Sequence, residues 1–363
     1  MGLDPRFGVA GAQGEPEGLY NGSFYGYNSL PQHPGAIPLL RRNPLPDRST
    51  DLSALPGYAR LAPNPRPWYL VGNEPNNMDP NAGDACSPQD YCEFLHQVHL
   101  IISSESPASK LAGPGLLNND EAWAARMVYY YKQMYGSNPP LDAWAFHTYN
   151  LSGAAAADWN HDIPEVMAAR AWINREGLGT LPIWITEFGA VRQADEGATA
   201  SYLDVYIPWL QSHGYWEYGV ARWFFFEHAW EADSPASHLV DRNNVLTLPG
   251  TRFRDYAYLQ NRSPRPVLDV QPRKVGPGIL NVTVSCTVPL QTIDRIEFGA
   301  PTVGTATLSD HPLPHVESFG HYGSTRGRPT ALSFVVVGEP PFTVPFTIFD
   351  NIGPWQSLVG MGS

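Results

Sequence analysis

Two segments of the chain place a glutamate directly after a short apolar run. The first run, Trp68–Gly72, is followed by Asn73-Glu74-Pro75, and the second, Leu181–Thr186, is followed by Glu187. Proline cannot continue a ladder, so the first run stops at its glutamate. An acid at the end of a buried strand is costly unless it is paired or used. Two such acids indicate glycoside hydrolysis, in which one carboxyl protonates the leaving oxygen while the other attacks the sugar or activates water.

Strand and helix patterns alternate between residues 67 and 260, and these elements must position the acids. Short runs rich in apolar or aromatic residues predict five strands, which are Trp68–Gly72, Lys110–Leu117, Leu141–Tyr149, Leu181–Glu187 and Gly219–Phe226. Helical spacing predicts four helices between them, which begin near Ser87, Asn119, Asp162 and Thr199. Such alternation predicts a parallel α/β sheet, and in a closed α/β barrel the active site lies at the carboxyl ends of the strands.

The first 66 residues differ, because they are rich in proline, glycine and asparagine and show no convincing amphipathic helix. Possible strands are Arg6–Ala10, Ser23–Tyr27 and Ala36–Leu40. Three strands in this short segment leave little room for helices, since a βαβ unit usually takes about 30 residues. We therefore expect an α/β fold, a compact (β/α)8 barrel with a loop-rich N-terminal part, over residues 1–262.

Residues 263–363 begin with the linker-like segment Ser263-Pro264-Arg265-Pro266. Apolar residues then alternate along Val282–Val288, Leu332–Val336 and Phe342–Ile348, with turn residues between the runs and no helical pattern. This predicts a C-terminal Ig-like β-sandwich domain of about 100 residues.

With both acidic motifs in order and two strand–helix units between them, residues 67–230 resemble the glycoside hydrolases of clan A, the 4/7 superfamily of (β/α)8 barrels. In that clan an Asn-Glu pair ends the fourth strand and carries the acid/base, as Asn73-Glu74 would, and the nucleophile ends the seventh, as Glu187 would. Phe146-His147-Thr148-Tyr149 is similar to the clan's His-x-Tyr at the end of the sixth strand. Trp223 stands on the eighth strand, where the clan places a tryptophan under the sugar. The compact core is most similar to the small glycosidases related to endo-β-1,3-glucanases.

The resemblance implies a retaining glycoside hydrolase that cleaves a β-linked poly- or oligosaccharide by double displacement. Glu187 would attack the anomeric carbon, and Glu74 would protonate the leaving oxygen and then deprotonate the incoming water. Glu187 should be ionised beside donors, with Glu74 kept protonated longer by its negative neighbour. Asn73 would donate to the sugar 2-hydroxyl. His147 would line the sugar site, and Tyr149 would orient the nucleophile.

Each of these residues also has a structural interpretation. The two acids could instead form a salt bridge or a loop cap, His147 could be a satisfied core histidine, and Tyr149 could serve packing alone. Trp223 would lie in the barrel interior or face the helices if the strand is shifted by one residue. The alternative function is a non-catalytic carbohydrate-binding protein on a glycosidase-like barrel. A third hypothesis assigns sugar binding or surface attachment to the C-terminal domain.

Composition narrows the classes of partner that the protein could bind. The 363 residues carry 23 Lys and Arg against 35 Asp and Glu, a formal net charge of -12, so we expect no nucleic-acid partner. No run approaches the ~18 apolar residues of a membrane helix, so we expect no membrane partner. The chain has no His-Glu-x-x-His and no Cys-x-x-Cys, and we expect no metal and no cofactor.

We expect a monomer that binds a carbohydrate substrate. Because enzymes that act on polysaccharides usually work outside the cell, we expect a secreted or cell-surface protein whose signal peptide is absent from this sequence. Cys86 and Cys92 lie close enough in the sequence to bridge.

Overall fold

The computed structural model describes residues 6–12, 19, 23–27, 30, 36–61, 68–149, 159–179, 181–190, 195–227, 238–241, 243–262, 269–285, 293–309, 311–318, 331–350 and 354–361. The chain divides into two compact units, Met1–Ser263 and Pro264–Ser363. The boundary expected from the sequence follows residue 262.

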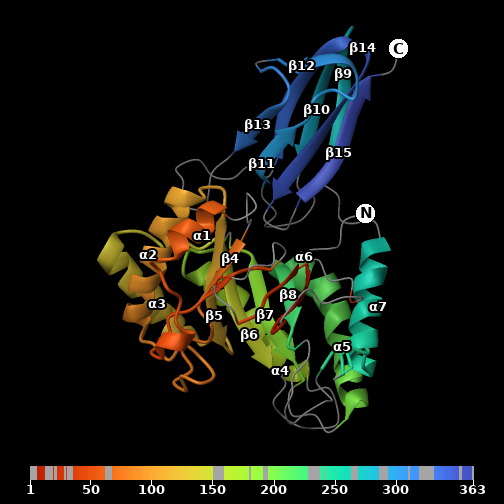
Figure 1. The fold of residues 1–363 in the computed structure, drawn as a ribbon. Helices are drawn as coiled ribbons and strands as arrows, with labels where there is room; N and C mark the ends of the chain where they lie inside the picture. The colour runs from red at the N-terminus through yellow and green to blue at the C-terminus, as the bar shows by residue number, and fades with distance from the viewer. Residues whose placement is uncertain are drawn as a thin grey trace. The chain divides into compact units, whose positions relative to one another are not determined.

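Eight parallel strands build the first unit (Figure 1). They are β1 Phe7–Val9, β2 Ser23–Phe24, β3 Leu39–Leu40, β4 Trp68–Val71, β5 Lys110–Leu117, β6 Ala143–Tyr149, β7 Ile183–Gly189 and β8 Val220–Phe225. Hydrogen bonds join them in the order β2-β1-β8-β7-β6-β5-β4-β3. The two ends of this order meet, because Phe24 forms a parallel bridge with Ala36 and its carbonyl accepts from the Ile37 N–H at 2.9 Å. The strands therefore follow one another in chain order, which fits the predicted (β/α)8 barrel.

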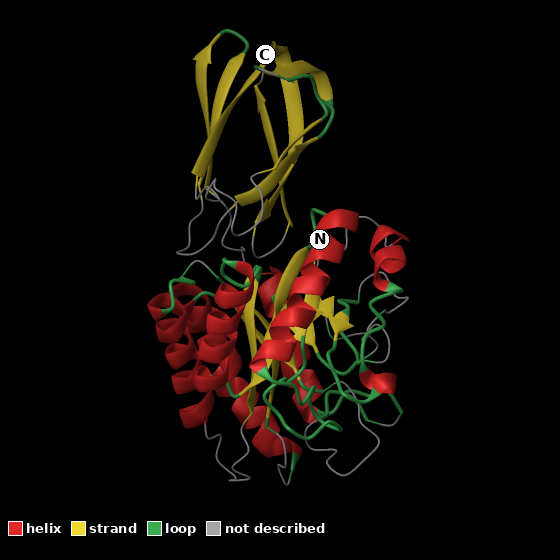
Figure 2. Cartoon of the chain, turned by 90° about the vertical axis from the view of Figure 1, so that its left-hand side faces the viewer, coloured by secondary structure: helices red, strands yellow, loops and turns green. Residues whose placement is uncertain are grey.

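Helices lie along the outside of these strands (Figure 2). They are α1 Leu55–Leu61, α2 Pro88–Glu105, α3 Glu121–Tyr135, α4 Trp159–Arg175, α5 Glu196–Trp209, α6 Tyr215–Tyr218 and α7 Leu248–Arg262, with a 3-10 turn at Pro46–Arg48 and a π-helical turn at Leu210–Gly214. α2 lies beside α3, and α5 lies beside α7 (Figure 1). α2 starts as predicted, since the Ser87 hydroxyl accepts from the Asp90 N–H at 3.1 Å.

α1 lies within the first 66 residues, where we expected no helix. It has only seven residues, and Pro56 and Gly57 stand near its start. Proline suits a first turn and glycine is a poor helix former, so such a short segment shows no helical period in the sequence.

Aromatic rings close the barrel at the end where its strands begin. Trp68 and Trp184, near the starts of β4 and β7, have ring centroids 4.3 Å apart. The guanidinium of Arg222 lies over both rings, 5.7 Å and 4.5 Å from their centroids. This packed floor leaves the opposite ends of the strands for a site.

The second unit is an antiparallel β-structure. Its strands are β9 Asp269–Gly276, β10 Ile279–Ser285, β11 Ile293–Phe298, β12 Val303–Leu308, β13 His315–Ser318, β14 Ala331–Asp350 and β15 Pro354–Met361. Two runs that we expected to be separate strands are both parts of β14, which pairs with β10, β11, β12 and β15. Val282, Phe298, Val336 and Phe346 share one apolar core. The all-β character matches the expectation, and the division into two packed sheets stays a prediction.

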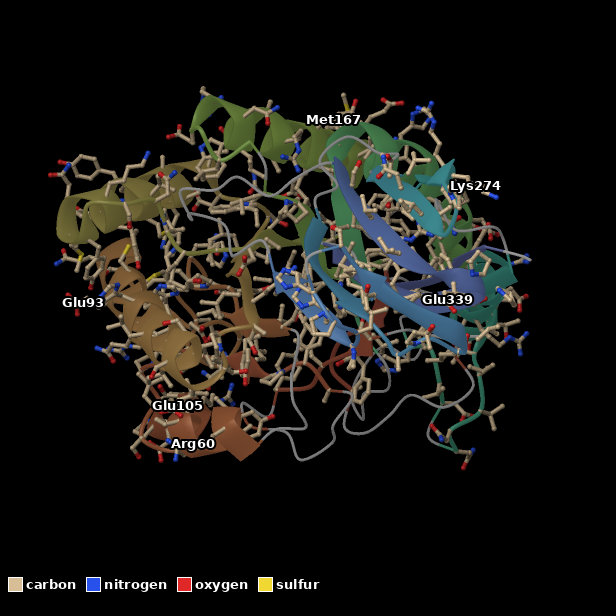
Figure 3. The ribbon with its side chains drawn as sticks, turned by 90° about the horizontal axis from the view of Figure 1, so that it is seen from above. Arg60, Glu93, Glu105, Met167, Lys274 and Glu339 are labelled. Carbon is tan, nitrogen blue, oxygen red and sulfur yellow. The ribbon has the colours of Figure 1, made fainter. Side chains whose placement is uncertain are left out.

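Charged side chains lie on the outer surface of the helices. Glu93 stands on α2, and Arg60 on α1 pairs with Glu105 on α2 at 2.9 Å (Figure 3). None of the helices in the described part of the chain combines the length and the apolar character that a membrane span needs. Cys86 and Cys92 are both buried and free, so the bridge that their spacing allowed is not formed.

Candidate active site

β4 ends in a tight turn that carries Asn73 and Glu74. Gly72 has a φ of 96°, and a Cβ there would lie 2.5 Å from the carbonyl oxygen of Pro114, so the turn requires glycine. Glu74 itself has a left-handed backbone with a φ of 47°, a strained conformation that is concentrated at functional sites. Its N–H donates to the carbonyl of Gly115 at 2.7 Å, and β5 thereby holds the turn in place.

A buried ion pair supports the same turn. Arg41 Nε, just after β3, donates to Asp84 Oδ1 at 2.8 Å, and the Asn73 N–H donates to Asp84 Oδ2 at 2.9 Å. Burial raises the pKa of Asp84, and the favourable interactions with Arg41 and with backbone N–H groups offset this only in part. The pair fixes the peptide that precedes Glu74.

Glu187, near the end of β7, is surrounded by tyrosine hydroxyls. Tyr25 and Tyr27, which follow β2, donate to Glu187 Oε1 at 3.0 Å and 3.2 Å, and the Tyr25 hydroxyl is shared with the Thr186 carbonyl at 2.7 Å. Tyr149, the last residue of β6, donates to Glu187 Oε2. Burial and the charge of Glu187 raise the pKa of all three tyrosines well above the ordinary value, so they stay protonated donors.

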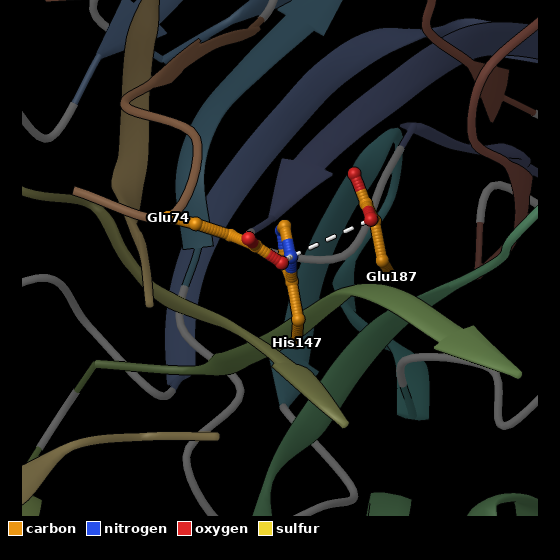
Figure 4. Close-up of side chains that lie close together, drawn as sticks. All are labelled: Glu74, His147 and Glu187. Carbon is orange, nitrogen blue, oxygen red and sulfur yellow. Dashed lines mark hydrogen bonds and ion pairs between the residues drawn. The ribbon is translucent and has the colours of Figure 1, made fainter. Parts of the chain in front are cut away.

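His147 on β6 lies between the two acids, with Glu74 and Glu187 on opposite sides of its ring (Figure 4). Its Nδ1 is 3.0 Å from Glu74 Oε1 and 3.5 Å from Glu187 Oε2. Asn77 Nδ2 donates to the other Glu74 oxygen at 2.7 Å. One oxygen of each acid and the histidine nitrogen all lie within 4.8 Å of one another. The structure thus brings together four of the predicted residues: Glu74, His147, Tyr149 and Glu187.

Neighbouring charges move the pKa values of the two acids in opposite directions. Burial raises the pKa of Glu74, but the hydrogen bond and charge of His147, together with Asn77 and Arg41, outweigh it, and the pKa lies below its usual value. Burial, together with the charge of Glu74, raises the pKa of Glu187 despite His147 and the tyrosine hydrogen bonds. Burial lowers the pKa of His147, but the two carboxylates outweigh it and the net shift is upward.

This order is the reverse of the one expected from the sequence, which gave Glu74 the higher pKa. The reason is the direct hydrogen bond from His147, which no sequence pattern showed. Groups this close exchange protons and titrate as a unit. The proton that we assigned to Glu74 alone is therefore held by the Glu74–His147 pair.

Asn73 is buried beside Glu74. Its Nδ2 donates to the carbonyl of Ala82 at 3.2 Å, whereas Oδ1 has no hydrogen-bond partner within the described part of the structure. Oδ1 and the second Nδ2 hydrogen are both left for a ligand, so the predicted donor role stays a prediction.

The prediction that Trp223 lies under the sugar is wrong. Trp223 is fully buried and packs edge-on against Phe7, which in turn contacts Phe253 of α7. Successive residues of a strand point to opposite sides, so Trp223 faces the helices while Arg222 faces the barrel interior. Phe226, directly after β8, lies at the site instead, and its ring meets that of Tyr149 edge-on at 5.7 Å.

Four further side chains lie at the site without having been predicted there: Tyr25, Tyr27, Asn77 and Phe226. Ser23–Tyr27 was recognised as a possible strand, and a polar aromatic residue at its carboxyl end was the available signal. Asn77 lies three residues after Glu74 in the turn, and nothing in its spacing distinguishes it from other loop asparagines.

Glu74, His147 and Glu187 could also each offer one ligand atom to a metal ion. The same side chains already interact with one another and with Asn77, Tyr25 and Tyr149. These three residues therefore form a hydrogen-bonded cluster that can share protons.

A parallel barrel with two buried, adjacent glutamates, one just after its fourth strand and one near the end of its seventh, is the arrangement expected of a glycoside hydrolase. The profile of the glycosyl hydrolase catalytic core matches residues 37–253, more than half of the chain, and the chain belongs to this family. A comparison with curated proteins finds no match.

Solved structures of similar fold come from family GH128. A subgroup II endo-beta-1,3-glucanase from Pseudomonas viridiflava is 20% identical with a TM-score of 0.52, and the match covers 69% of this chain and 97% of that one. A subgroup II endo-beta-1,3-glucanase from Sorangium cellulosum is 16% identical with a TM-score of 0.54, covering 69% and 98%. A subgroup VII oligosaccharide-binding protein from Trichoderma gamsii is 14% identical with a TM-score of 0.52, covering 71% and 95%. At these identities the likeness concerns the fold.

Proposed function

We propose that this protein is a retaining glycoside hydrolase that cleaves a β-linked glucan, with Glu187 as nucleophile and Glu74 as acid/base. The observation that carries the proposal is the approach of the two acids, whose nearest oxygens and the His147 nitrogen lie within 4.8 Å of one another. Retaining glycosidases hold their carboxyl groups about 5–5.5 Å apart, whereas inverting ones leave roughly 6.5–9.5 Å for a water.

The surroundings of each acid support these roles. Glu187 would attack the anomeric carbon as the glycosidic C–O bond breaks, and the proton of the Glu74–His147 pair would pass to the leaving oxygen. Glu74 would then take a proton from the water that displaces Glu187. The tyrosine hydroxyls stabilise charge on Glu187, and Asn77 orients Glu74.

A β-1,3-glucan is the substrate that the comparisons favour. The structural neighbours from Pseudomonas viridiflava and Sorangium cellulosum are endo-beta-1,3-glucanases. We propose this substrate class together with a monomeric protein that works outside the cell, where such polymers are found.

Hydrolysis of laminarin, a β-1,3-glucan, tests the proposal, with xylan as the comparison polymer. Glu74→Gln should lower kcat/KM by about 10²–10⁴-fold, and Glu187→Gln by at least as much, because each loses its proton transfer or covalent step. Glu93→Gln, a change on the outer surface of α2, is the matched control and should keep full activity. Activity that survives both active-site changes would refute the proposal.

A second candidate function is an oligosaccharide-binding protein without turnover. Two observations favour it: the lowered pKa of Glu74, since an ionised carboxylate donates no proton, and the binding protein among the structural neighbours. Binding of laminarihexaose without any reducing-end product from the unaltered chain would support this candidate instead.

A further inference from the structure

Glu227 is a third acid at this end of the barrel, and the reaction proposed above does not use it. It lies two residues after the end of β8 and is only 6% exposed. Its Oε1 is 3.7 Å from His238 Nε2, which is too long for a hydrogen bond. Its Oε2 is buried and has no hydrogen-bond partner among the residues that the structure describes. An unpaired buried oxygen is costly, and a hydrogen bond from a ligand would offset that cost.

Glu227 lies next to the proposed nucleophile. The charge of Glu187 raises the Glu227 pKa after burial, the larger cause, and the Glu227 charge in turn raises the pKa of Tyr27. Tyr27 donates to Glu187 at 3.2 Å. A Cβ on Gly11 would lie 3.2 Å from Glu227 Oε2 and 3.8 Å from Tyr27 Cε2, so all three residues meet at one point beyond β1. Glu227 therefore borders the site from the β8–β1 side.

The chemistry of this carboxyl suits a sugar hydroxyl. Burial and the charge of Glu187 raise the Glu227 pKa to about 8, so the group is neutral at pH 7. A neutral carboxyl has one O–H donor and retains acceptor capacity, and a sugar hydroxyl likewise both donates and accepts. Burial lowers the pKa of the neighbouring His238, which supplies no counter-charge at neutral pH.

We infer that Glu227 is a substrate-recognition residue of the same site, whose Oε2 exchanges a hydrogen bond with a hydroxyl of the sugar unit bound beside Glu187. The inference rests on the proposed function, because it takes a glucan as the ligand. A neutral Glu227 adds no second negative charge beside the nucleophile, which leaves Glu187 free to ionise.

Calorimetric binding of laminarihexaose to the Glu74→Gln variant, in which we expect turnover to be slow, measures this contact. A second change, Glu227→Leu, should raise Kd at least tenfold because it removes the hydrogen bond at similar volume. Glu227→Gln still donates and accepts, and should keep Kd within about twofold at pH 6. Glu93→Gln should leave Kd unchanged. Equal Kd for Glu227→Leu and its parent would overturn the inference.

The pH dependence of Kd distinguishes substrate recognition by Glu227 from a purely structural role. This measurement still tests the inference if Glu227→Leu fails to fold. Between pH 6 and 9 the parent should lose affinity at least fivefold as Glu227 ionises and loses its donor. Glu227→Gln should remove that loss, and an unchanged pH dependence in this variant would refute the inference. If the unaltered chain hydrolyses laminarin but Glu227→Leu keeps its KM, only this inference fails. If the chain neither hydrolyses nor binds any β-glucan, the proposed function fails first.

Discussion

His147 is the side chain that contacts both acids. Its Nδ1 contacts both carboxylates, and its pKa is raised. The Glu74–His147 pair therefore keeps its proton at pH values above those at which a histidine usually loses it. The acid limb of kcat/KM should report Glu187, whose raised pKa means that activity is lost at a higher pH than for an ordinary glutamate.

Replacement of His147 tests this proton sharing. In His147→Asn the last catalytic proton resides on Glu74 alone, which is intrinsically a stronger acid than histidine. The basic limb of the kcat/KM profile should therefore move to lower pH, with kcat reduced about 10²-fold. An unshifted basic limb, measured over pH 4–9 on laminarin, would show that His147 takes no part in holding the proton.

At the scale of secondary-structure elements, the ends of β3 and β4 are tied together by Arg41 and Asp84. Asp84 is fully buried, so Asp84→Ala leaves Arg41 without its partner and should lower the free energy of unfolding by about 3–5 kcal/mol. It should also reduce kcat, because the Asn73 N–H loses its acceptor.

The exposed pair Arg60–Glu105 offers a matched control between α1 and α2 (Figure 3). Glu105→Ala should change the free energy of unfolding far less, since solvent screens an exposed ion pair. Urea unfolding of both variants gives the comparison, and similar losses would contradict the structural role of Asp84.

The length and apolar pattern of each strand decide which parts of this fold could be predicted from the sequence. β4 to β8 are apolar runs with clear ends, so their order and both acids followed from the sequence. β2 and β3 lie within the predicted runs Ser23–Tyr27 and Ala36–Leu40, but two residues are too few to show which side chains face the site. Tyr25 and Tyr27 were therefore not predicted as site residues. Trp223 was assigned to the wrong side because a shift of one residue reverses the facing of a strand. The direction of each pKa shift depends on contacts between different strands, which no local pattern contains.

At the scale of the whole molecule, two carboxyls with raised pKa values make stability depend on pH. Burial raises the pKa of Glu165 and Glu227 to about 8, each with help from a nearby acid. The unfolded chain loses these protons near pH 4.3, so the native state binds more protons between roughly pH 4 and 8. The contribution of these groups to the free energy of unfolding is therefore fully present below this window. It is lost as pH rises through the window, by at most about 1.4 kcal/mol per pH unit for each group.

Glu227→Gln removes one of these titrating groups, and it should flatten the fall in the free energy of unfolding between pH 5 and 8. Urea unfolding at four pH values measures the slope. A slope equal to that of the unaltered chain would mean that Glu227 has an ordinary pKa in the folded protein.

The anomeric configuration of the first product tests the central claim most directly. Proton NMR of laminarihexaose hydrolysis should show the β-anomer first, before mutarotation, because two displacements at Glu187 restore the original configuration. Initial formation of the α-anomer would mean a single displacement by water, and it would contradict the assignment of Glu187 as a covalent nucleophile.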